Sequence, residues 1–236
     1  SLLTSDQTVG EDVASVFEFL KYNYRIPEYQ RLLVSPHSSR SGLLARMDRE
    51  IEYARQGYRA MMTLKCNNLD DRQFTMKLYE ASKAGVQIRL IVRGMCSLLP
   101  GVAGFSDNIE AISIIDRYLE HPRVYVFHNR GAPEYLLGSA DLMTRNIDYR
   151  VEVLCPIQDP IVQQKLQDIL DQQWHDNVKA RVLNESQDNE MVGRAKTAPA
   201  LRSQETIHRY LQTGKKPRMP RTLMRQASRR RRLPSG

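Results

Sequence analysis

The chain has 236 residues, of which 41% are hydrophobic, enough for one compact core of about 100–200 residues with extensions. No apolar run approaches the roughly 18–20 residues of a membrane-spanning helix, and the first residues lack a signal-peptide pattern. The net charge of +8 is concentrated at one end, because nine Lys and Arg residues and no acidic residue lie between Gly214 and Gly236. Subtracting these nine leaves −1 for residues 1–213, so an anion site in the body must depend on a few placed cations.

The cysteines indicate the cellular compartment. Cys66, Cys96 and Cys155 are widely spaced, and none belongs to a CxxC pair or to a Cys/His cluster with zinc spacing. We therefore expect reduced thiols and a cytoplasmic protein, whose basic end could also contact a membrane surface peripherally. The chain begins with Ser-Leu-Leu-Thr, and we expect it to be a fragment of a longer protein.

Strand and helix patterns alternate along the chain, which predicts an α/β layered fold. Glycines at Gly57 and Gly85 are typical helix ends, and Asp70 and Asp71 are typical helix starts. In the first half we predict a strand end at 1–4, a helix over 10–22, a strand over 32–34, a helix from the serines at 38–41 to Gly57, a strand over 60–64, a helix from Asp70 to Gly85 and a strand over 86–92.

The second half continues the alternation. We predict a loop over 94–108, a β-hairpin over 123–141, a strand over 149–154, a helix from Asp159 to about Asp176, a linker over 191–201 and a helix over 203–211. The pattern over 109–118 is ambiguous and slightly favours a strand. The hairpin turns at Asn129-Arg130-Gly131. We expect the basic, proline-containing end of the chain to be disordered.

The start of this hairpin carries the first candidate site. His121 and Arg123 flank Pro122 directly before an apolar strand, and side chains two positions apart on a strand point to the same side. An imidazole beside a guanidinium suits a group that carries phosphate. On its own, a histidine before a proline is more often a surface or strand-end residue.

Two further arginines are candidates. Arg93 follows the apolar strand 86–92 and precedes Gly94, and ligands of open α/β sheets gather beyond the carboxyl ends of strands. The common alternative for such an arginine is a solvated or salt-bridged charge. Arg150 could equally be a strand-edge charge paired with Glu152 or Asp148.

The spacing around His121 resembles a motif of the phospholipase-D superfamily. That motif is His-x-Lys, four residues, Asp, and later Gly-Ser-x-Asn; here Arg123 replaces Lys, His128 replaces Asp, and Asp141 ends Gly-Ser-Ala-Asp. These departures argue against phosphodiesterase chemistry. They match the second of two such domains in the type 1 polyphosphate kinases.

The resemblance to that C-terminal kinase domain covers residues 1–183 and includes LKCNNL, VRGMCSL, SDNIEAISIIDRYLEHPRVYVF and SADLMTRNIDYR. It implies a phospholipase-D-like mixed β-sheet flanked by helices. It also implies reversible transfer of the ATP γ-phosphate to polyphosphate through a phosphohistidine, with Mg²⁺, in a homo-oligomeric enzyme. His121 would be the second, non-phosphorylated histidine, and the phosphate-binding arginines would be Arg93, Arg150 and Arg123.

The same resemblance places the phosphorylated histidine and the ATP-binding region in preceding domains that this chain lacks, so we predict that the isolated fragment is inactive. We divide the chain into a domain over 1–183, a linker and short helix over 184–213, and a basic tail over 214–236. Two alternatives remain open. One is a nuclease that joins two motif copies by homodimerisation, and the other is a module that binds polyanions through its tail.

Overall fold

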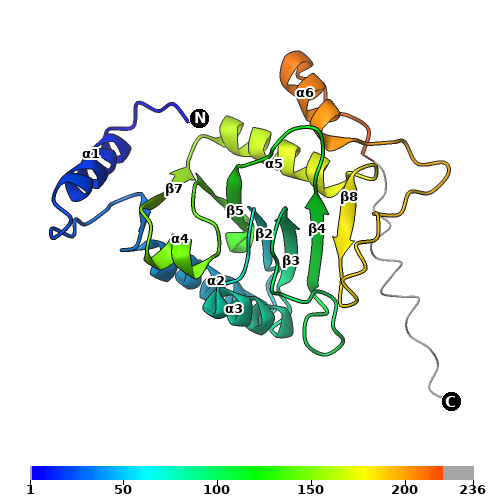
Figure 1. The fold of residues 1–236 in the computed structure, drawn as a ribbon, viewed down its shortest axis with the longest axis horizontal. Helices are drawn as coiled ribbons and strands as arrows, with labels where there is room; N and C mark the ends of the chain where they lie inside the picture. Colours follow the sequence, from blue (N-terminus) through cyan, green and yellow to red (C-terminus); the bar gives the residue numbers. More distant parts are fainter. Residues whose placement is uncertain (1, 220–236) are drawn as a thin grey trace.

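The protein is described by a computed structural model that covers residues 2–219 (Figure 1). Its framework is one eight-stranded sheet in the order β1-β7-β6-β5-β2-β3-β4-β8. The strands are β1 (Leu33–Ser35), β2 (Met61–Cys66), β3 (Gln87–Val92), β4 (Ile109–Ile114), β5 (Arg123–Phe127), β6 (Glu134–Gly138), β7 (Glu152–Ile157) and β8 (Ala180–Leu183). The helices are α1 (Gln7–Lys21), α2 (Ser39–Arg55), α3 (Arg72–Lys83), the short 3-10 turn η1 (Asn129–Gly131), α4 (Thr144–Asp148), α5 (Pro160–Trp174) and α6 (Ser203–Thr213).

The sheet is mixed. β2, β3 and β4 are parallel to one another, whereas β5 pairs antiparallel with β2, and β6, β7 and β1 continue antiparallel beyond it. β8 pairs antiparallel with β4 at the other edge. The carboxyl ends of the parallel strands therefore lie on the same side of the sheet as the start of β5 and the end of β6. β4 points toward the side that carries α6 (Figure 1).

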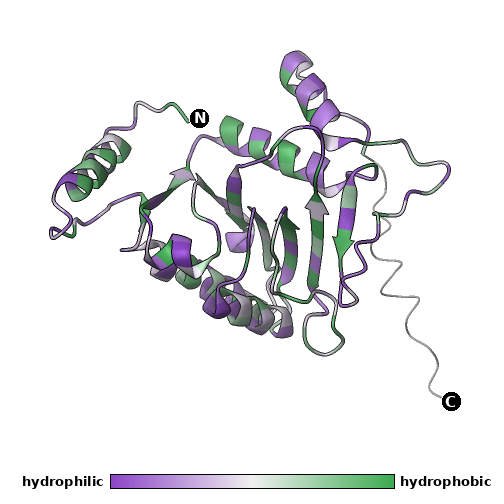
Figure 2. Ribbon diagram, in the orientation of Figure 1, coloured by the Kyte–Doolittle hydropathy of each residue, from purple (hydrophilic) through white to green (hydrophobic). Residues whose placement is uncertain are grey.

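Helices cover both faces of the sheet, and most strands are therefore buried on both sides. On one face α2 and α3 pack on the larger core, which includes Leu43, Phe74 and Leu90. On the other face α5 contributes Leu170 and Trp174 to a second core. Hydrophobic residues of the strands and of the helix faces toward the sheet are green in Figure 2. The predicted α/β class, with a mixed sheet flanked by helices, is confirmed.

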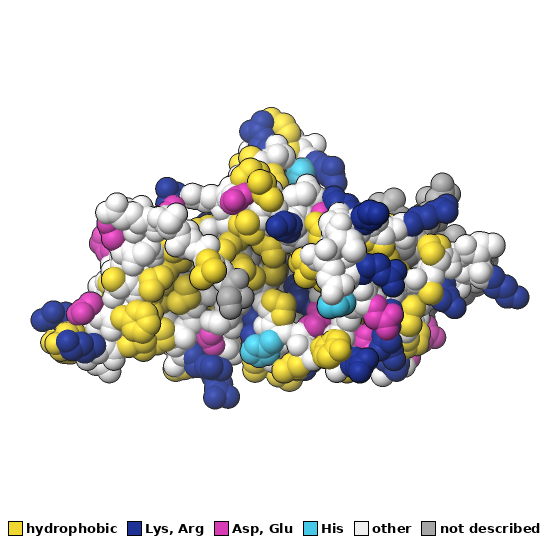
Figure 3. Space-filling model, turned by 90° about the horizontal axis from the view of Figure 1, so that it is seen from above, with side chains coloured by type: hydrophobic (Ala, Val, Ile, Leu, Met, Phe, Trp, Pro, Cys, Tyr) yellow, Lys and Arg dark blue, Asp and Glu magenta, His cyan; other side chains and the backbone are white. Residues whose placement is uncertain are grey.

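The first helix, α1, lies at one end of the molecule and packs against residues of β1 and β7 (Figure 1). Its Asp12 carboxylate is buried and accepts hydrogen bonds from the backbone N–H groups of residues 30–32. Of the apolar residues that predicted this helix, Val16 is buried, while Phe17 and Leu20 are exposed. Apolar side chains gather over this half of the face in Figure 3, whereas Lys and Arg are more frequent over the other half.

Some predicted elements were wrong at their ends. Residues 2–4 form no strand, the helix predicted from residue 10 begins at Gln7, and the strand predicted over 109–118 ends at Ile114. α1 starts early because the Asp6 side chain accepts a hydrogen bond from the Val9 N–H and so caps the helix. The strand predicted over 149–154 is β7 at 152–157.

Two elements were not predicted. α4 is a single turn at 144–148, too short to produce a helical hydrophobic period. β8 is only four residues long, and three of them are only partly buried. Short elements of this kind are specified by their tertiary neighbours more than by their own sequence.

The segment after β8 is attached to the body of the protein. Leu201 and Ser203 are buried, and Tyr210 on α6 donates a hydrogen bond of 2.7 Å to Asp168 on α5. Most of the predicted basic tail, from residue 220 onward, lies outside the described residues. Within residues 2–219, no helix combines the length and hydropathy needed to cross a bilayer.

Candidate functional site

Three chain segments bring polar residues to the edge of the sheet that is formed by the carboxyl ends of the parallel strands β2 and β3. Asn67 follows the end of β2, Arg93 follows the end of β3, and Arg123 begins the antiparallel β5 beside β2. The strand order therefore places side chains from distant parts of the chain next to one another. This edge is the candidate site.

A continuous hydrogen-bond network joins five residues at this edge. Arg93 Nε donates to Asn67 Oδ1 at 2.9 Å, and the Asn67 backbone N–H donates to Asp141 Oδ1 at 2.7 Å. Arg123 donates to both Asp141 oxygens, from Nε at 3.0 Å and from Nη2 at 2.9 Å. Arg123 Nη1 lies 2.8 Å from His121 Nδ1. The edge network therefore consists of Arg93, Asn67, Asp141, Arg123 and His121.

Arg123 is the buried centre of the edge network. It is 6% exposed, and its third nitrogen also donates to the His121 backbone carbonyl at 2.8 Å. Burial alone would raise the pKa of Asp141, but the hydrogen bonds from Arg123 and from the Asn67 N–H lower it. The pair is therefore ionised and internally neutral. The guanidinium of Arg123 is hydrogen-bonded to Asp141 and to His121, so Arg123 fixes the position of the histidine.

Arg93 has a different environment. It is partly exposed, and among the described residues its only side-chain hydrogen bond is the one from Nε to Asn67. Within the same part of the chain it forms no salt bridge, so its positive charge is not neutralised by a neighbouring carboxylate. Both of its terminal nitrogens can therefore donate to an anion.

Gly94 explains how the chain passes this point. A Cβ at residue 94 would lie 2.5 Å from Asn68 Oδ1 and 3.0 Å from the Asn67 carbonyl oxygen. Any larger residue here would push the Asn68 side chain away or separate the two loops after β2 and β3. This close approach allows Asn67 to reach Arg93.

Asn67 is a site residue that the sequence reasoning missed. Its side chain is buried, its Oδ1 accepts from Arg93, and its Nδ2 has no hydrogen-bond partner among the described residues. A buried, unpaired amide group is costly, so it often marks a place where a ligand or water binds. The available signal was the Asn-Asn pair after strand 60–64, because parallel strands bring their carboxyl ends together.

A second ion pair supports the residue next to His121. Lys65 on β2 is buried and donates to Glu120 Oε2 at 2.8 Å, and Gln173 on α5 donates to the same oxygen. The sequence reasoning named neither Lys65 nor Glu120. This contact fixes Glu120 against the sheet, while His121 itself is exposed at the rim.

Arg150 lies at the same edge but outside the edge network. Its Nε is 3.3 Å from Glu152 Oε1, and its side chain is 53% exposed. This is one of the two pairings that its sequence position suggested; the other candidate, Asp148, pairs with Arg40. The structure thus brings together His121, Arg123 and Arg93 and leaves Arg150 two strands away, before β7.

The remaining positions that the sequence singled out have structural roles or lie away from the candidate site. His128 follows the far end of β5, at the opposite end of the strand from His121. Gly138 pairs so closely with β7 that a Cβ would lie 1.9 Å from the Val153 carbonyl oxygen. Cys66 is fully buried, and burial raises the pKa of its thiol, so it is not a nucleophile at neutral pH.

The site does not fit a resident magnesium ion. Among residues 2–219, no three His, Cys, Asp or Glu side chains are grouped closely enough to hold a metal. The two carboxylates nearest His121 in the hydrogen-bond pattern, Glu120 and Asp141, are already paired with Lys65 and Arg123. We therefore assign no ligand of this chain to Mg²⁺.

Comparison with known proteins identifies the family. The sequence model described as "Polyphosphate kinase C-terminal domain 2" matches residues 32–204. A polyphosphate kinase of Vibrio vulnificus is 49% identical over 216 residues, which is 92% of this chain and 31% of that protein. The polyphosphate kinase of Escherichia coli K12 is 47% identical over 217 residues, again 92% of this chain and 31% of that protein.

A solved structure supports the same assignment. The crystal structure of polyphosphate kinase from Porphyromonas gingivalis superposes with a TM-score of 0.84 and 37% sequence identity, over 89% of this chain and 32% of that one. This chain thus spans about a third of the length of these relatives. On these matches the chain belongs to the polyphosphate kinase C-terminal domain family.

Proposed function

We propose that this chain forms one wall of the active site of an enzyme that reversibly transfers the ATP γ-phosphate to inorganic polyphosphate. The observation that carries the proposal is the edge network, which connects an uncompensated arginine, Arg93, to an exposed histidine, His121. A transferring phosphoryl group spreads negative charge over its oxygens, and positioned cations and hydrogen-bond donors stabilise that charge.

Arg93 and His121 have separate roles in this proposal. The terminal nitrogens of Arg93 bind phosphate oxygens in a bidentate manner, while Asn67 fixes the plane of the guanidinium through Nε. Arg123 Nη1 lies 2.8 Å from His121 Nδ1 and 3.3 Å from Nε2. In the tautomer in which Nδ1, the nearer atom, accepts from Arg123, the proton of the neutral ring resides on Nε2. Nε2 can then donate to a phosphate oxygen or protonate a leaving oxygen.

The phosphorylated nucleophile is assigned to another part of the enzyme. The candidate site contains one exposed histidine, His121. Its neighbour Arg123 is already paired with the Asp141 carboxylate through two hydrogen bonds. We propose that a histidine from a preceding domain forms the phosphohistidine and faces His121 across the site. Arg150, at 53% exposure, would contact the more distant phosphates of the chain.

The surroundings of this enzyme complete the proposal. ATP, ADP and polyphosphate are its substrates, and Mg²⁺ arrives on their phosphates, where it lowers their negative charge. The enzyme is a cytoplasmic homo-oligomer, and the basic tail provides polyanion or peripheral membrane contact. The isolated chain is inactive because it lacks the nucleophile.

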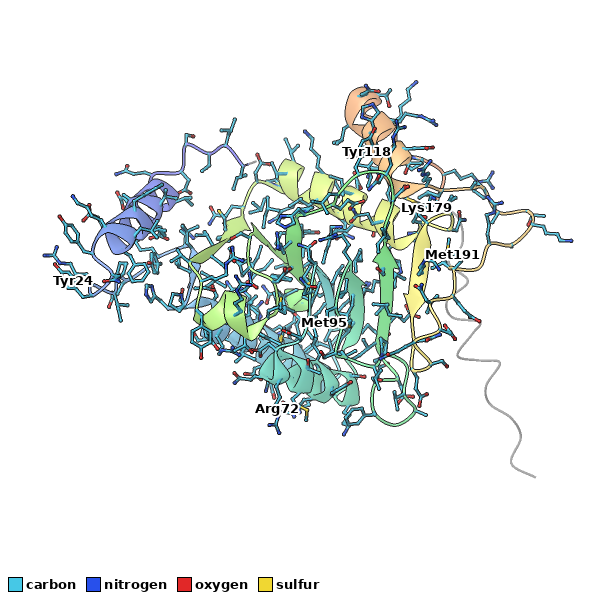
Figure 4. The ribbon with its side chains drawn as sticks, viewed as in Figure 1. Tyr24, Arg72, Met95, Tyr118, Lys179 and Met191 are labelled. Carbon is cyan, nitrogen blue, oxygen red and sulfur yellow. The ribbon has the colours of Figure 1, made fainter. Side chains whose placement is uncertain are left out.

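Complementation tests the proposal. The remaining N-terminal part of the polyphosphate kinase is mixed with this chain, and ATP-dependent polyphosphate synthesis is measured. We expect activity only in the mixture, and we expect His121→Ala and Arg93→Ala to abolish it. The matched controls are His208→Ala on α6 and Arg72→Ala on α3, both exposed residues outside the edge network; Figure 4 shows Arg72 away from Met95, which lies in the segment after Arg93.

Two results would contradict the proposal. One is full activity of the N-terminal part without this chain. The other is hydrolysis of bis-p-nitrophenyl phosphate by this chain alone, lost in His121→Ala, which would instead indicate a phosphodiesterase. The buried Arg123–Asp141 pair argues against the second result, because that chemistry needs a cation on the phosphate at this position.

A further inference from the structure

The loop that carries His121 has little structure of its own. It connects β4 to β5, and among the described residues no backbone–backbone hydrogen bond involves residues 116–121. Ile115, Tyr118 and Leu119 are exposed, so apolar packing does not fix the loop either. Its conformation must therefore be set by side chains that reach it from other elements.

Arg202, at the N-cap position of α6, holds the beginning of this loop. Its Nε and Nη2 donate to the two carboxylate oxygens of Asp116 at 2.8 and 2.6 Å. The Asp116 side chain is only 1% exposed, and the hydrogen bond from Arg202 lowers its pKa, so the carboxylate stays charged and paired.

Gln204, in the first turn of α6, holds the middle of the loop. Its side chain pairs with both backbone groups of Tyr118: Oε1 accepts from the N–H at 2.9 Å, and Nε2 donates to the carbonyl at 2.8 Å. Nε2 also donates to Glu120 Oε1 at 3.1 Å. Tyr118 lies beside α6 in Figure 4. One glutamine therefore replaces the backbone partners that the loop lacks.

Glu120 closes the connection to the site. One of its oxygens receives Gln204, and the other receives Lys65 and Gln173 from the sheet and α5. The next residue is His121, whose carbonyl and ring contact Arg123. The loop is thus fixed on its inner side by the sheet and on its outer side by α6.

α6 is itself fixed on the body by polar contacts. The Ser203 N–H donates to the buried Asp176 at 2.7 Å, and Tyr210 donates to Asp168. Most of α6 is coloured hydrophilic in Figure 2, which agrees with attachment through these polar groups. The family match ends at residue 204, so most of α6 lies beyond it.

We propose that α6 positions His121, with Arg202 and Gln204 as positioning residues for the loop of residues 115–122. This inference rests on the proposed function for its catalytic meaning, because it specifies what orients the histidine of that site. Arg202 and Gln204 do not touch the substrate. They act by restricting the loop from which His121 extends.

The test uses this chain and inorganic tripolyphosphate as the probe. In Gln204→Ala we expect the amide hydrogen exchange of Tyr118, whose N–H donates to Gln204 Oε1, to accelerate about fivefold to tenfold, as the loss of a hydrogen bond worth about 1 kcal/mol predicts. We also expect the ring resonance of His121 to shift or broaden, and the dissociation constant for tripolyphosphate to rise about threefold. Arg202→Ala should act in the same direction. Arg202→Lys, which keeps a cation beside Asp116, should return part of the way to the behaviour of the parent chain.

Gln212→Ala is the matched control, because it makes the same change at an exposed position of the same helix. It should alter neither the loop nor the His121 resonance. Unchanged Tyr118 exchange and an unchanged His121 resonance in both Gln204→Ala and Arg202→Ala, with the helical content of the chain preserved by circular dichroism, would overturn the inference. Failure of the proposed function is a separate result: tripolyphosphate affinity would then be unaffected by His121→Ala in the parent chain, while the exchange data would still report on positioning.

Discussion

At the scale of single residues, the edge shows that neighbouring cations can have different roles. Arg93 and Arg123 belong to the same edge network, yet one is unneutralised and partly exposed, while the other is buried against Asp141. Asn67 accounts for part of this difference, because its neutral amide accepts from Arg93 without cancelling the charge. A carboxylate at the same place would orient Arg93 equally well but would neutralise it.

Asn67→Asp should therefore weaken anion binding more than Asn67→Ala does. We expect the dissociation constant for tripolyphosphate to rise about tenfold in Asn67→Asp, equivalent to about 1.4 kcal/mol, and about threefold in Asn67→Ala. Isothermal titration calorimetry at fixed salt measures both. Asn189→Asp, which adds the same charge at an exposed position, is the control. Equal affinities for Asn67→Asp and the parent would contradict the role given to Arg93.

The Arg123–Asp141 pair leads to a prediction about stability. Arg123→Met leaves a buried carboxylate without its partner and should lower the free energy of unfolding by about 3–5 kcal/mol. Adding Asp141→Asn removes the unpaired charge and keeps an acceptor for the Asn67 N–H, so the double variant should regain part of the loss. Urea unfolding of the single and double variants gives the coupling energy. A loss below about 1 kcal/mol in Arg123→Met would show that the pair is not buried as described.

At the scale of secondary-structure elements, one carboxylate joins three helices. Asp71 caps α3 by accepting from the N–H groups of Gln73 and Phe74, pairs with Arg40 of α2, and accepts from the Thr144 hydroxyl of α4. Arg40 also pairs with Asp148 at the other end of α4. The short α4, which no sequence period predicted, is thus placed by ionic contacts from distant residues.

These contacts predict a pH dependence. Burial would raise the pKa of Asp71, but the hydrogen bonds from Arg40 and Thr144 lower it from 3.8 to about 2. A depressed pKa stabilises the folded state above the unfolded value, and that stabilisation is lost as the pH falls from about 4 through about 2. Asp71→Asn, which keeps the helix cap, should cost about 2 kcal/mol at pH 7.

Urea unfolding at several pH values measures this difference, which should shrink between pH 5 and pH 3. Asp48→Asn serves for comparison, because Asp48 is an exposed partner of Lys77 and such pairs contribute less than about 1 kcal/mol. A difference between Asp71→Asn and the parent that stays constant down to pH 3 would contradict the assigned pKa.

At the scale of the whole molecule, the sequence predicted more of the fold than of the site. Long apolar periods predicted the main helices and the central strands, because their patterns are local. The contact between Asn67 and Arg93 depends on β2 and β3 lying side by side, and the contact between Arg123 and Asp141 depends on the β5–β6 register. Their positions at strand ends made His121 and Arg93 candidates, and a family resemblance gave them roles, but no local period could specify the network that joins them.

The loop of residues 115–122 illustrates the same limit. Its first residues continue the apolar pattern of β4, so a strand over 109–118 was the natural prediction. The strand ends at Ile114, opposite Ala180 at the start of β8, and Asp116 pairs instead with Arg202, which is far along the chain. Contacts of this kind are visible only in the folded molecule.

The charge distribution leads to a prediction for the complete chain. Removal of residues 220–236 deletes six of the nine cations of the basic end, which the sequence places at Arg221, Arg225 and 229–232. We expect binding to long polyanions to weaken steeply and to lose most of its salt dependence, while tripolyphosphate binding at Arg93 is unchanged. Fluorescence titration at 50 and 200 mM salt measures both. If tripolyphosphate binding disappears with the tail, the edge of the sheet is not an anion site.

The order of strands in the sheet also bears on how the protein folds during synthesis. β1, at residues 33–35, lies at an edge of the sheet and pairs only with β7, at residues 152–157. On the ribosome, β1 therefore remains without a partner until most of the domain has emerged. The outer side of β4 likewise has no strand partner until β8, at residues 180–183, has been synthesised. Long-range pairings of this type slow folding and leave apolar strands exposed on the nascent chain, so we expect this domain to depend on early chaperone binding during translation.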